Sequence, residues 1–130
     1  MQRLATYEQF QASADRVKDD LLQFLIEQKR AGKQVAGYGA AAKGNTLLNY
    51  AGVKRDLLPY VCDAAPSKQG KFLPGSHIPI MAPAVLSERR PDIVLILPWN
   101  IAAEVVSQQR DVCGTGTQFM IAVPAMREVP

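Results

Sequence analysis

The sequence contains few of the residues that build metal centres or disulfide frameworks. It has two cysteines, Cys62 and Cys113, and one histidine, His77, and no short C-x-x-C spacing. This set is too small for a structural zinc site. Two isolated cysteines are typical of reduced, inert thiols in a cytoplasmic protein. We therefore expect no metal site in this chain, no disulfide and a cytoplasmic location.

Long apolar runs and a strong charge of one sign are also missing. No apolar run approaches the ~20 residues that cross a membrane, and the first residues show no signal-peptide pattern. The chain has 15 Lys and Arg against 12 Asp and Glu, a net charge of +3. This charge is too small and too dispersed to indicate nucleic acid. We expect neither a membrane nor a nucleic acid as partner, and a local anionic ligand fits better.

The composition is that of an ordinary globular domain, with 48% hydrophobic and 21% charged residues. A chain of 130 residues buries roughly two-thirds of its unfolded surface on folding, enough for stability without metals or disulfides. We expect one domain over residues 1–130. Residues 1–31 would form a leading helix and connector, and residues 32–130 an α/β core.

The apolar pattern predicts an alternation of helices and strands. Residues 8–31 carry apolar side chains at helical spacing, and Gly32 follows as the expected C′ residue. The further predicted elements are strands at 34–38, 57–62, 78–80, 92–97 and 118–123 and helices at 43–51, 83–89 and 101–111. Continuous apolar strands such as 93–97 are typical of a parallel sheet covered on both faces. The predicted fold is a Rossmann-like three-layer α/β sandwich with a mostly parallel sheet of about five strands and an N-terminal helix.

The segment 64–77 has neither the helical nor the strand period. It contains Pro66, Gly70, Pro74 and Gly75, which favour turns. We therefore predict an ordered loop where a full dinucleotide-binding fold has a crossover helix.

A glycine turn, Gly37-Tyr38-Gly39-Ala40-Ala41-Ala42-Lys43-Gly44, joins the first predicted strand to the next helix. Such a turn lets backbone N–H groups at a helix start approach a phosphate. Ala42 stands where a third glycine often occurs, which gives the accepted G-x-G-x-x-A variant, and Asp63 follows at the distance of a ribose-binding acid. The same spacing is also typical of tight packing alone, so both interpretations stay open.

Further candidates follow the other strands at the same predicted sheet edge. Lys43 and Lys68 are suited to neutralising phosphate charge. Trp99, the single tryptophan, would stack on a base or sugar or pack against another domain. Asn100 is placed to cap a helix that begins at Ile101. His77 is a less favoured candidate for a general base, because no catalytic partner set accompanies it.

Four blocks of the sequence, taken together, resemble a known family. They are residues 37–50, Lys68-Gln69-Gly70, residues 74–80 and residues 95–100. In this order they resemble the C-terminal domain of SAM-dependent sugar C-methyltransferases, which methylate a carbon of nucleotide-linked deoxyketosugars. The resemblance covers nearly the whole chain.

The resemblance implies an enzyme of three parts: an N-terminal zinc-binding region, a central SAM-binding domain and this Rossmann-like domain, with the nucleotide-sugar between the last two. In the parent enzyme a base removes a proton beside the sugar ketone, and the enolate takes the methyl group of SAM. Since the chain matches only the last part, no catalytic residue and no metal ligand is carried over. The expected substrate-binding residues are Gly37, Tyr38, Gly39, Ala40, Ala41, Ala42, Lys43, Gly44, Asp63, Lys68, Trp99 and Asn100.

Two alternatives remain open from the sequence. The first is a self-sufficient nucleotide, SAM or NAD module, which the glycine turn and Asp63 suggest. Val35 stands where a SAM site has an acidic residue, and no dehydrogenase proton relay is recognisable. The second is a purely structural interaction domain whose glycine turn binds nothing.

Overall fold

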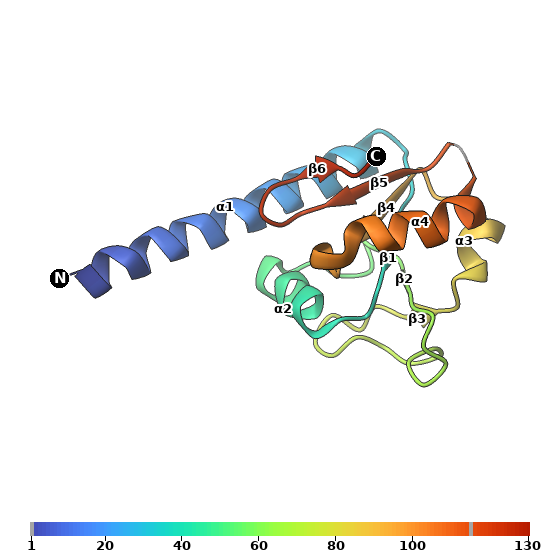
Figure 1. Ribbon diagram of the computed structural model, residues 1–130, viewed down its shortest axis with the longest axis horizontal. Helices are drawn as coiled ribbons and strands as arrows, with labels where there is room; N and C mark the ends of the chain where they lie inside the picture. The colour runs from blue at the N-terminus through green and yellow to red at the C-terminus, as the bar shows by residue number, and fades with distance from the viewer. Residues whose placement is uncertain (1, 115) are drawn as a thin grey trace.

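The computed structural model describes residues 2–114 and 116–130, with side chains from Ser13 onward. Helices and strands alternate along most of the chain (Figure 1). The elements are α1 (Gln2–Arg30), β1 (Val35–Tyr38), α2 (Ala42–Ala51), β2 (Val61–Cys62), β3 (Ile80–Met81), α3 (Ala84–Arg89), β4 (Ile93–Ile96), the 3-10 helix η1 (Trp99–Ile101), α4 (Ala102–Cys113), β5 (Gln118–Ile121) and β6 (Arg127–Glu128).

The strands form one sheet with the order β3-β2-β1-β4-β5-β6. The first five are parallel, and β6 is antiparallel to β5. In the centre Val35 pairs with Ile93 and Tyr38 with Ile96. The strand order reverses between β1 and β4, which is the switch point where open α/β sheets bind ligands. The predicted Rossmann-like sandwich with a mostly parallel sheet is confirmed.

Each face of the sheet has its own apolar core. On one face Leu21 and Leu25 of α1 and Leu48 of α2 pack against alternate strand residues. On the other face Leu86 of α3 and Val105 of α4 pack against the residues between them. This alternation follows from the two-residue period of a strand, and it explains why the central strands are apolar throughout.

The end of α1 confirms the prediction for Gly32. Gly32 has φ +76°, and its N–H donates to the carbonyl of Lys29 at 3.1 Å. The N–H of Lys33 donates to the carbonyl of Gln28 at 3.0 Å, which completes a Schellman motif. At its other end α1 extends well past the sheet and the remaining helices (Figure 1).

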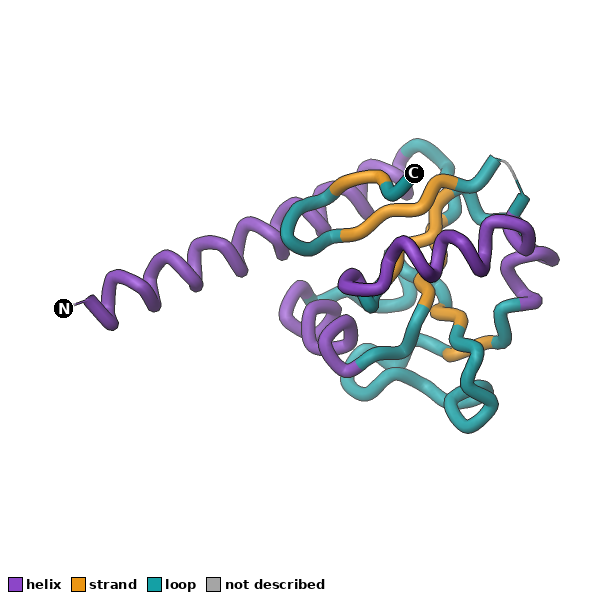
Figure 2. The backbone as a smooth tube through the Cα atoms, in the orientation of Figure 1, coloured by secondary structure: helices purple, strands orange, loops and turns teal. Residues whose placement is uncertain are grey.

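Apart from shifts of one or two residues, the structure departs from the predictions in three places. The helix begins at Gln2 rather than at residue 8. The strand predicted over 57–62 is confined to Val61–Cys62, because the N–H groups of Leu57 and Leu58 donate to the carbonyl of Lys54 in a turn. The antiparallel β6 was not predicted. The connection from β2 to β3 contains no helix, as expected, and Figure 2 shows it as a long loop.

Candidate functional site

The glycine turn connects β1 to α2 at the carboxyl edge of the sheet, where it packs tightly against the end of β4. Gly39 has φ +92°, and a Cβ atom there would lie 2.5 Å from Cδ of Pro98. A Cβ atom on Gly44 would lie 2.5 Å from Cβ of Leu97. Gly44, rather than the position of Ala42, therefore permits the close approach of helix to strand. Packing alone is a sufficient reason for these two glycines.

Two backbone N–H groups of the turn are already bonded inside the domain. The N–H of Gly39 donates to the carbonyl of Cys62, and the N–H of Ala40 donates to Oδ2 of Asp63, both at 2.7 Å. The N–H groups of residues 42–44 belong to the first turn of α2, where a helix has no acceptor of its own. The N-cap residue, Ala41, supplies no side-chain acceptor. The N–H groups available to an anion are therefore those of residues 42–44, in the first turn of α2, and not those of Gly39 and Ala40.

Asp63 fastens the turn after β1 to the loop after β2. Its Oδ2 accepts the N–H of Ala40, and its Oδ1 accepts the N–H of Ala65 at 2.8 Å. The Lys68 ammonium lies 4.0 Å from Oδ2 and donates to the carbonyl of Ala40 at 3.1 Å. Each carboxylate oxygen of Asp63 thus accepts a hydrogen bond from a backbone N–H of the domain. This structural role explains an aspartate at this position without a bound ribose.

Tyr38 contributes only its backbone to the turn. Its side chain is buried on the α4 face, where the Nε2 of Gln109 donates to its hydroxyl oxygen at 3.1 Å. Burial raises the pKa of Tyr38, with smaller contributions from the charge of Asp63 and from Cys62. The hydroxyl is therefore a neutral structural group and faces away from the first turn of α2.

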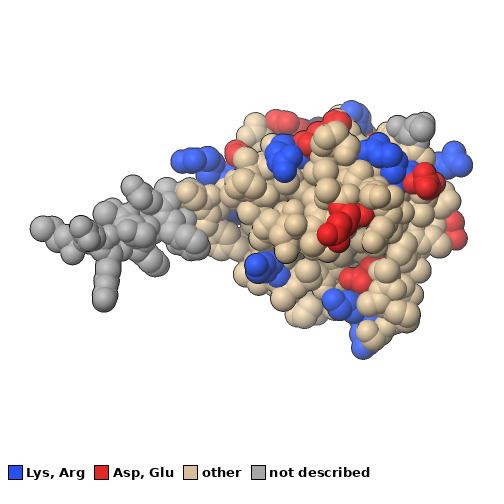
Figure 3. Space-filling view, viewed as in Figure 1, with Lys and Arg blue, Asp and Glu red and all other residues tan. Residues whose placement is uncertain are grey.

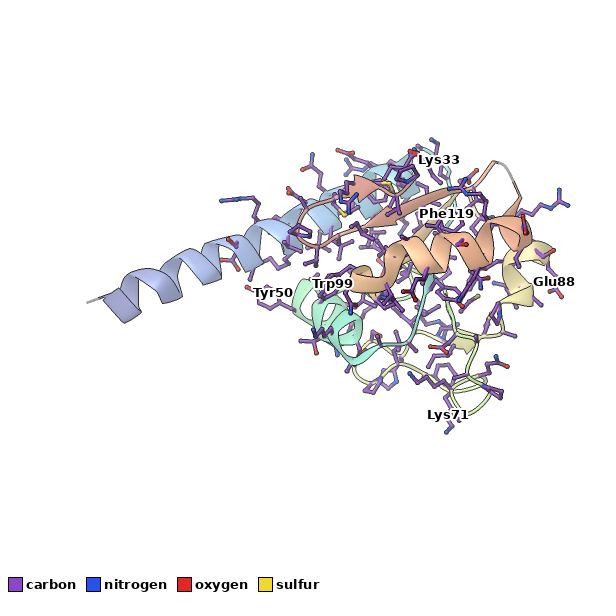
Figure 4. All side chains as sticks on the ribbon, viewed as in Figure 1. Lys33, Tyr50, Lys71, Glu88, Trp99 and Phe119 are labelled. Atoms are coloured by element: carbon purple, nitrogen blue, oxygen red, sulfur yellow. The ribbon has the colours of Figure 1, made fainter. Side chains whose placement is uncertain are left out.

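The end of β4 places Trp99 and Asn100 in η1, at the same edge of the sheet. Trp99 is half-buried and contacts the core on the α4 face. Figure 4 shows its side chain close to the start of α4 and near Tyr50. Asn100 is exposed. The prediction that it caps α4 is wrong, because a 3-10 turn intervenes and the N-cap residue is Ile101, with no side-chain cap bond.

Family comparison agrees with this architecture. Residues 1–124 match the family model described as the C-methyltransferase C-terminal domain. The chain belongs to this family. It is similar to the C-methyltransferase NovU of Streptomyces niveus, with 35% identity over 123 residues, which are 95% of this chain and 29% of NovU. The C-methyltransferase C-terminal domain thus spans less than a third of that relative's length.

Charges on this C-methyltransferase C-terminal domain are mixed. On the face seen in Figure 3, Lys and Arg alternate with Asp and Glu and form no continuous basic surface. Lys43 is exposed in the first turn of α2, and Lys68 reaches the carbonyl of Ala40 from the neighbouring loop. Both predicted lysines therefore lie near the glycine turn, Lys43 in the helix that follows it and Lys68 in the loop after β2.

The structure does not bring His77 to this edge. His77 is exposed at φ +58°, in a turn that lies beside the last part of α2, where Nδ2 of Asn49 donates to the carbonyl of Pro74. Cys62 and Cys113 are buried and free. Burial is the main cause that raises the pKa of Cys62 to about 12, so its thiol is protonated at neutral pH.

Among the side chains that the structure describes, from residue 13 to 114 and from 116 to 130, no three His, Cys, Asp or Glu are grouped as metal ligands. Between residues 2 and 114 and from 116 to 130, no helix is both long and apolar enough to cross a membrane.

Two polar residues near the glycine turn were missed by the sequence reasoning. Gln69 donates its Nε2 to the carbonyl of Asp63 at 2.8 Å and so braces the same loop. Asn45, in α2, has a buried Oδ1 without a hydrogen-bond partner in the described structure. Both lie within the blocks that carry the family resemblance, and this was the only signal in the sequence that pointed to them.

Proposed function

We propose that this domain binds the nucleotide-linked deoxyketosugar of a SAM-dependent C-methyltransferase and presents it to a methyltransferase domain elsewhere in the same protein. The observation that carries the proposal is the uncapped first turn of α2, at the switch point of a sheet in a member of the C-methyltransferase C-terminal domain family. Helix N-termini at this place in α/β folds favour phosphate groups.

The diphosphate would accept hydrogen bonds from the N–H groups of Ala42, Lys43 and Gly44. An anion at a helix N-terminus gains about 0.3–1 kcal/mol when exposed. The Lys43 ammonium would add a flexible point charge. Lys68 would offset the negative charge of Asp63, which lies 4.0 Å away. In this account Gly39, Ala40 and Asp63 shape the turn without contacting the ligand through their amides.

The sugar would lie toward Trp99 and Asn100, at the neighbouring strand end. Bound SAM supplies the methyl group, and holding the sugar carbon in line with it is worth several kcal/mol, on the order of the orientation effects known for enzymes. We assign no catalytic residue to this domain, because its contribution is binding and orientation.

SAM itself is poorly matched to this chain. A SAM or NAD site at this edge needs a free acid for the ribose hydroxyls. Each oxygen of Asp63 already accepts a backbone N–H group, which leaves fewer lone pairs for ribose hydroxyls. This argues against a self-sufficient SAM or NAD module. We therefore propose that an upstream SAM-binding domain and a zinc-binding region complete the enzyme. We also propose a cytoplasmic location, because free cysteines are typical of proteins in reducing compartments.

Calorimetric titration with a TDP-sugar tests the proposal, with the chain alone and with the chain joined to a methyltransferase part. We expect binding, weakened about tenfold at low salt by the double variant Lys43→Gln/Lys68→Gln, because two charges near the diphosphate are lost. The matched control Lys33→Gln/Lys54→Gln removes the same net charge from exposed positions outside this edge. The absence of binding in both formats would leave the structural interaction domain as the better account.

A further inference from the structure

A groove of about 400 Å³ lies between α1, α2, η1 and the residues that follow β5. We call it the α1 groove. Ser13, Ala14 and Val17 of α1 form one wall, Leu47 and Tyr50 of α2 the second, and Trp99 with residues 123–124 the third. It is separate from the first turn of α2, because Leu47 and Tyr50 lie in the later turns of that helix.

The lining of the α1 groove is apolar apart from two hydroxyl groups and the indole N–H of Trp99. The hydroxyl of Tyr50 donates to the carboxylate of Asp15, so one of the two hydroxyls is already engaged. Nucleotides and sugars need several placed polar groups for orientation. Aliphatic and aromatic side chains of a protein need only shape and apolar surface, as at the centre of protein interfaces. The groove therefore fits a protein segment better than a nucleotide.

The wall made by α1 is held in place before any partner arrives. Besides the bond between Tyr50 and Asp15, the Lys18 ammonium lies 5.5 Å from the centroid of the Tyr50 ring. Tyr50 remains 44% exposed, and Ile101, in the same 3-10 helix as Trp99, is 42% exposed. A fixed groove bordered by exposed apolar side chains is typical of an interaction surface.

The groove continues an apolar pattern that begins in the core. Leu21 and Leu25 of α1 are fully buried, and Ala14 and Val17 line the groove. In the sequence the spacing of three to four residues continues upstream through Phe10, Tyr7 and Leu4. The helix itself extends past the rest of the domain (Figure 1). A helix that carries such a pattern beyond its own core is suited to packing against a further element.

We infer that the α1 groove and the projecting half of α1 receive an apolar segment of the methyltransferase part of the protein. The chain matches a family described as a C-terminal domain and covers 29% of NovU, so most of that relative's length lies outside the matched region. This favours a neighbouring domain over a second copy of the chain. The inference rests on the proposed function in one respect: both assume that the methyltransferase part belongs to the same protein.

Hydrogen–deuterium exchange tests the inference by comparing the 130-residue chain with a polypeptide in which it follows the methyltransferase part. We expect the amides of residues 2–18 and 99–101 to exchange at least about tenfold more slowly in the longer polypeptide, because docking adds to the free energy of local opening. Ala14→Arg, which places a long charged side chain in the groove, should restore the fast exchange. Ala31→Arg, at an exposed position directly after the end of α1 and outside the groove, should not.

Thermal unfolding of each variant in the 130-residue chain establishes that the domain remains folded. Equal exchange rates in the short and long polypeptides would overturn the inference. Protection that appears only at high concentration of the short chain, or only on addition of a TDP-sugar, would overturn it in favour of self-association or of a ligand site. Protection by the methyltransferase part without any TDP-sugar binding would support the docking surface and contradict the proposed function.

Discussion

The carboxylate of Asp63 accepts the backbone N–H of Ala40 at 2.7 Å and thereby joins the ends of two neighbouring strands. In dinucleotide-binding folds an acid at this place commonly meets a ribose. Here it stabilises the turn that sets the position of α2. The glycine turn is consequently a fixed structure, and the amides open to an anion are those of the following helical turn.

Replacing Asp63 should destabilise the domain in proportion to the hydrogen bonds lost. Asp63→Ala leaves the N–H groups of Ala40 and Ala65 without acceptors, and we expect a loss of about 2 kcal/mol in the free energy of unfolding. Asp63→Asn keeps one acceptor oxygen and should lose about half as much. Urea unfolding measures both. Asp56→Ala, which removes an exposed carboxylate 4.0 Å from Lys29, is the control and should cost less than about 1 kcal/mol. Equal losses for Asp63→Ala and Asp56→Ala would contradict the role assigned to Asp63.

Gly44→Ala should destabilise the domain, whereas a glycine-to-alanine substitution in a helix usually stabilises it. In an open helix position alanine is about 1 kcal/mol more stable than glycine. Here the new Cβ would lie 2.5 Å from Cβ of Leu97, so α2 must shift, and we expect a loss of about 1–3 kcal/mol. Thr46→Ala, at an exposed position of the same helix, serves as control and should change stability by less than about 0.5 kcal/mol. A more stable Gly44→Ala variant in thermal unfolding would show that the close contact is not limiting.

Stability should fall in alkaline solution because of two buried acids. Burial is the main cause that raises the pKa of the Cys62 thiol from 9.0 to about 12 and that of the Tyr60 hydroxyl from 10.0 to about 12. Below pH 9 both groups are protonated in the folded and the unfolded chain, so they add no pH dependence. The unfolded chain loses its protons first, above pH 9 at Cys62 and above pH 10 at Tyr60. Each group then lowers the free energy of unfolding by about 1.4 kcal/mol per pH unit until its folded pKa is reached.

Urea unfolding at pH 8, 10 and 11 measures this slope. Cys62→Ala should be less stable at pH 8 but should show a smaller decrease between pH 8 and 11, because the contribution of the Cys62 thiol is removed. A pH-independent free energy of unfolding over this range would contradict the assignment of Cys62 and Tyr60 as buried neutral groups.

Periodicity predicted the layers of the fold because they depend on local apolar patterns. Ile93–Ile96 are apolar throughout and form a central strand buried on both faces. Periodicity failed where tertiary contacts decide. The backbone of residues 54–58 closes a turn and shortens β2 to two residues. The two residues of β6 are exposed and pair only with β5, so no apolar pattern marks them.

The residues of the candidate site were predictable by location but not by role. Parallel strands bring Asp63 and the glycine turn to one edge, as expected. The sequence could not show that Asp63 bonds the turn itself, since this depends on the distance between two loops. Nor could it show that α4 begins after a 3-10 turn, which removes Asn100 from the cap position.

The most direct test of the account is an amide-resolved NMR titration of the chain with thymidine diphosphate. We predict that the largest chemical-shift changes occur at the N–H groups of Ala42, Lys43 and Gly44, with smaller changes at Gly39 and Ala40, whose amides are already bonded. Changes confined to another surface, or no change at millimolar ligand both in the chain alone and in the chain joined to a methyltransferase part, would contradict the claim that the first turn of α2 holds the diphosphate.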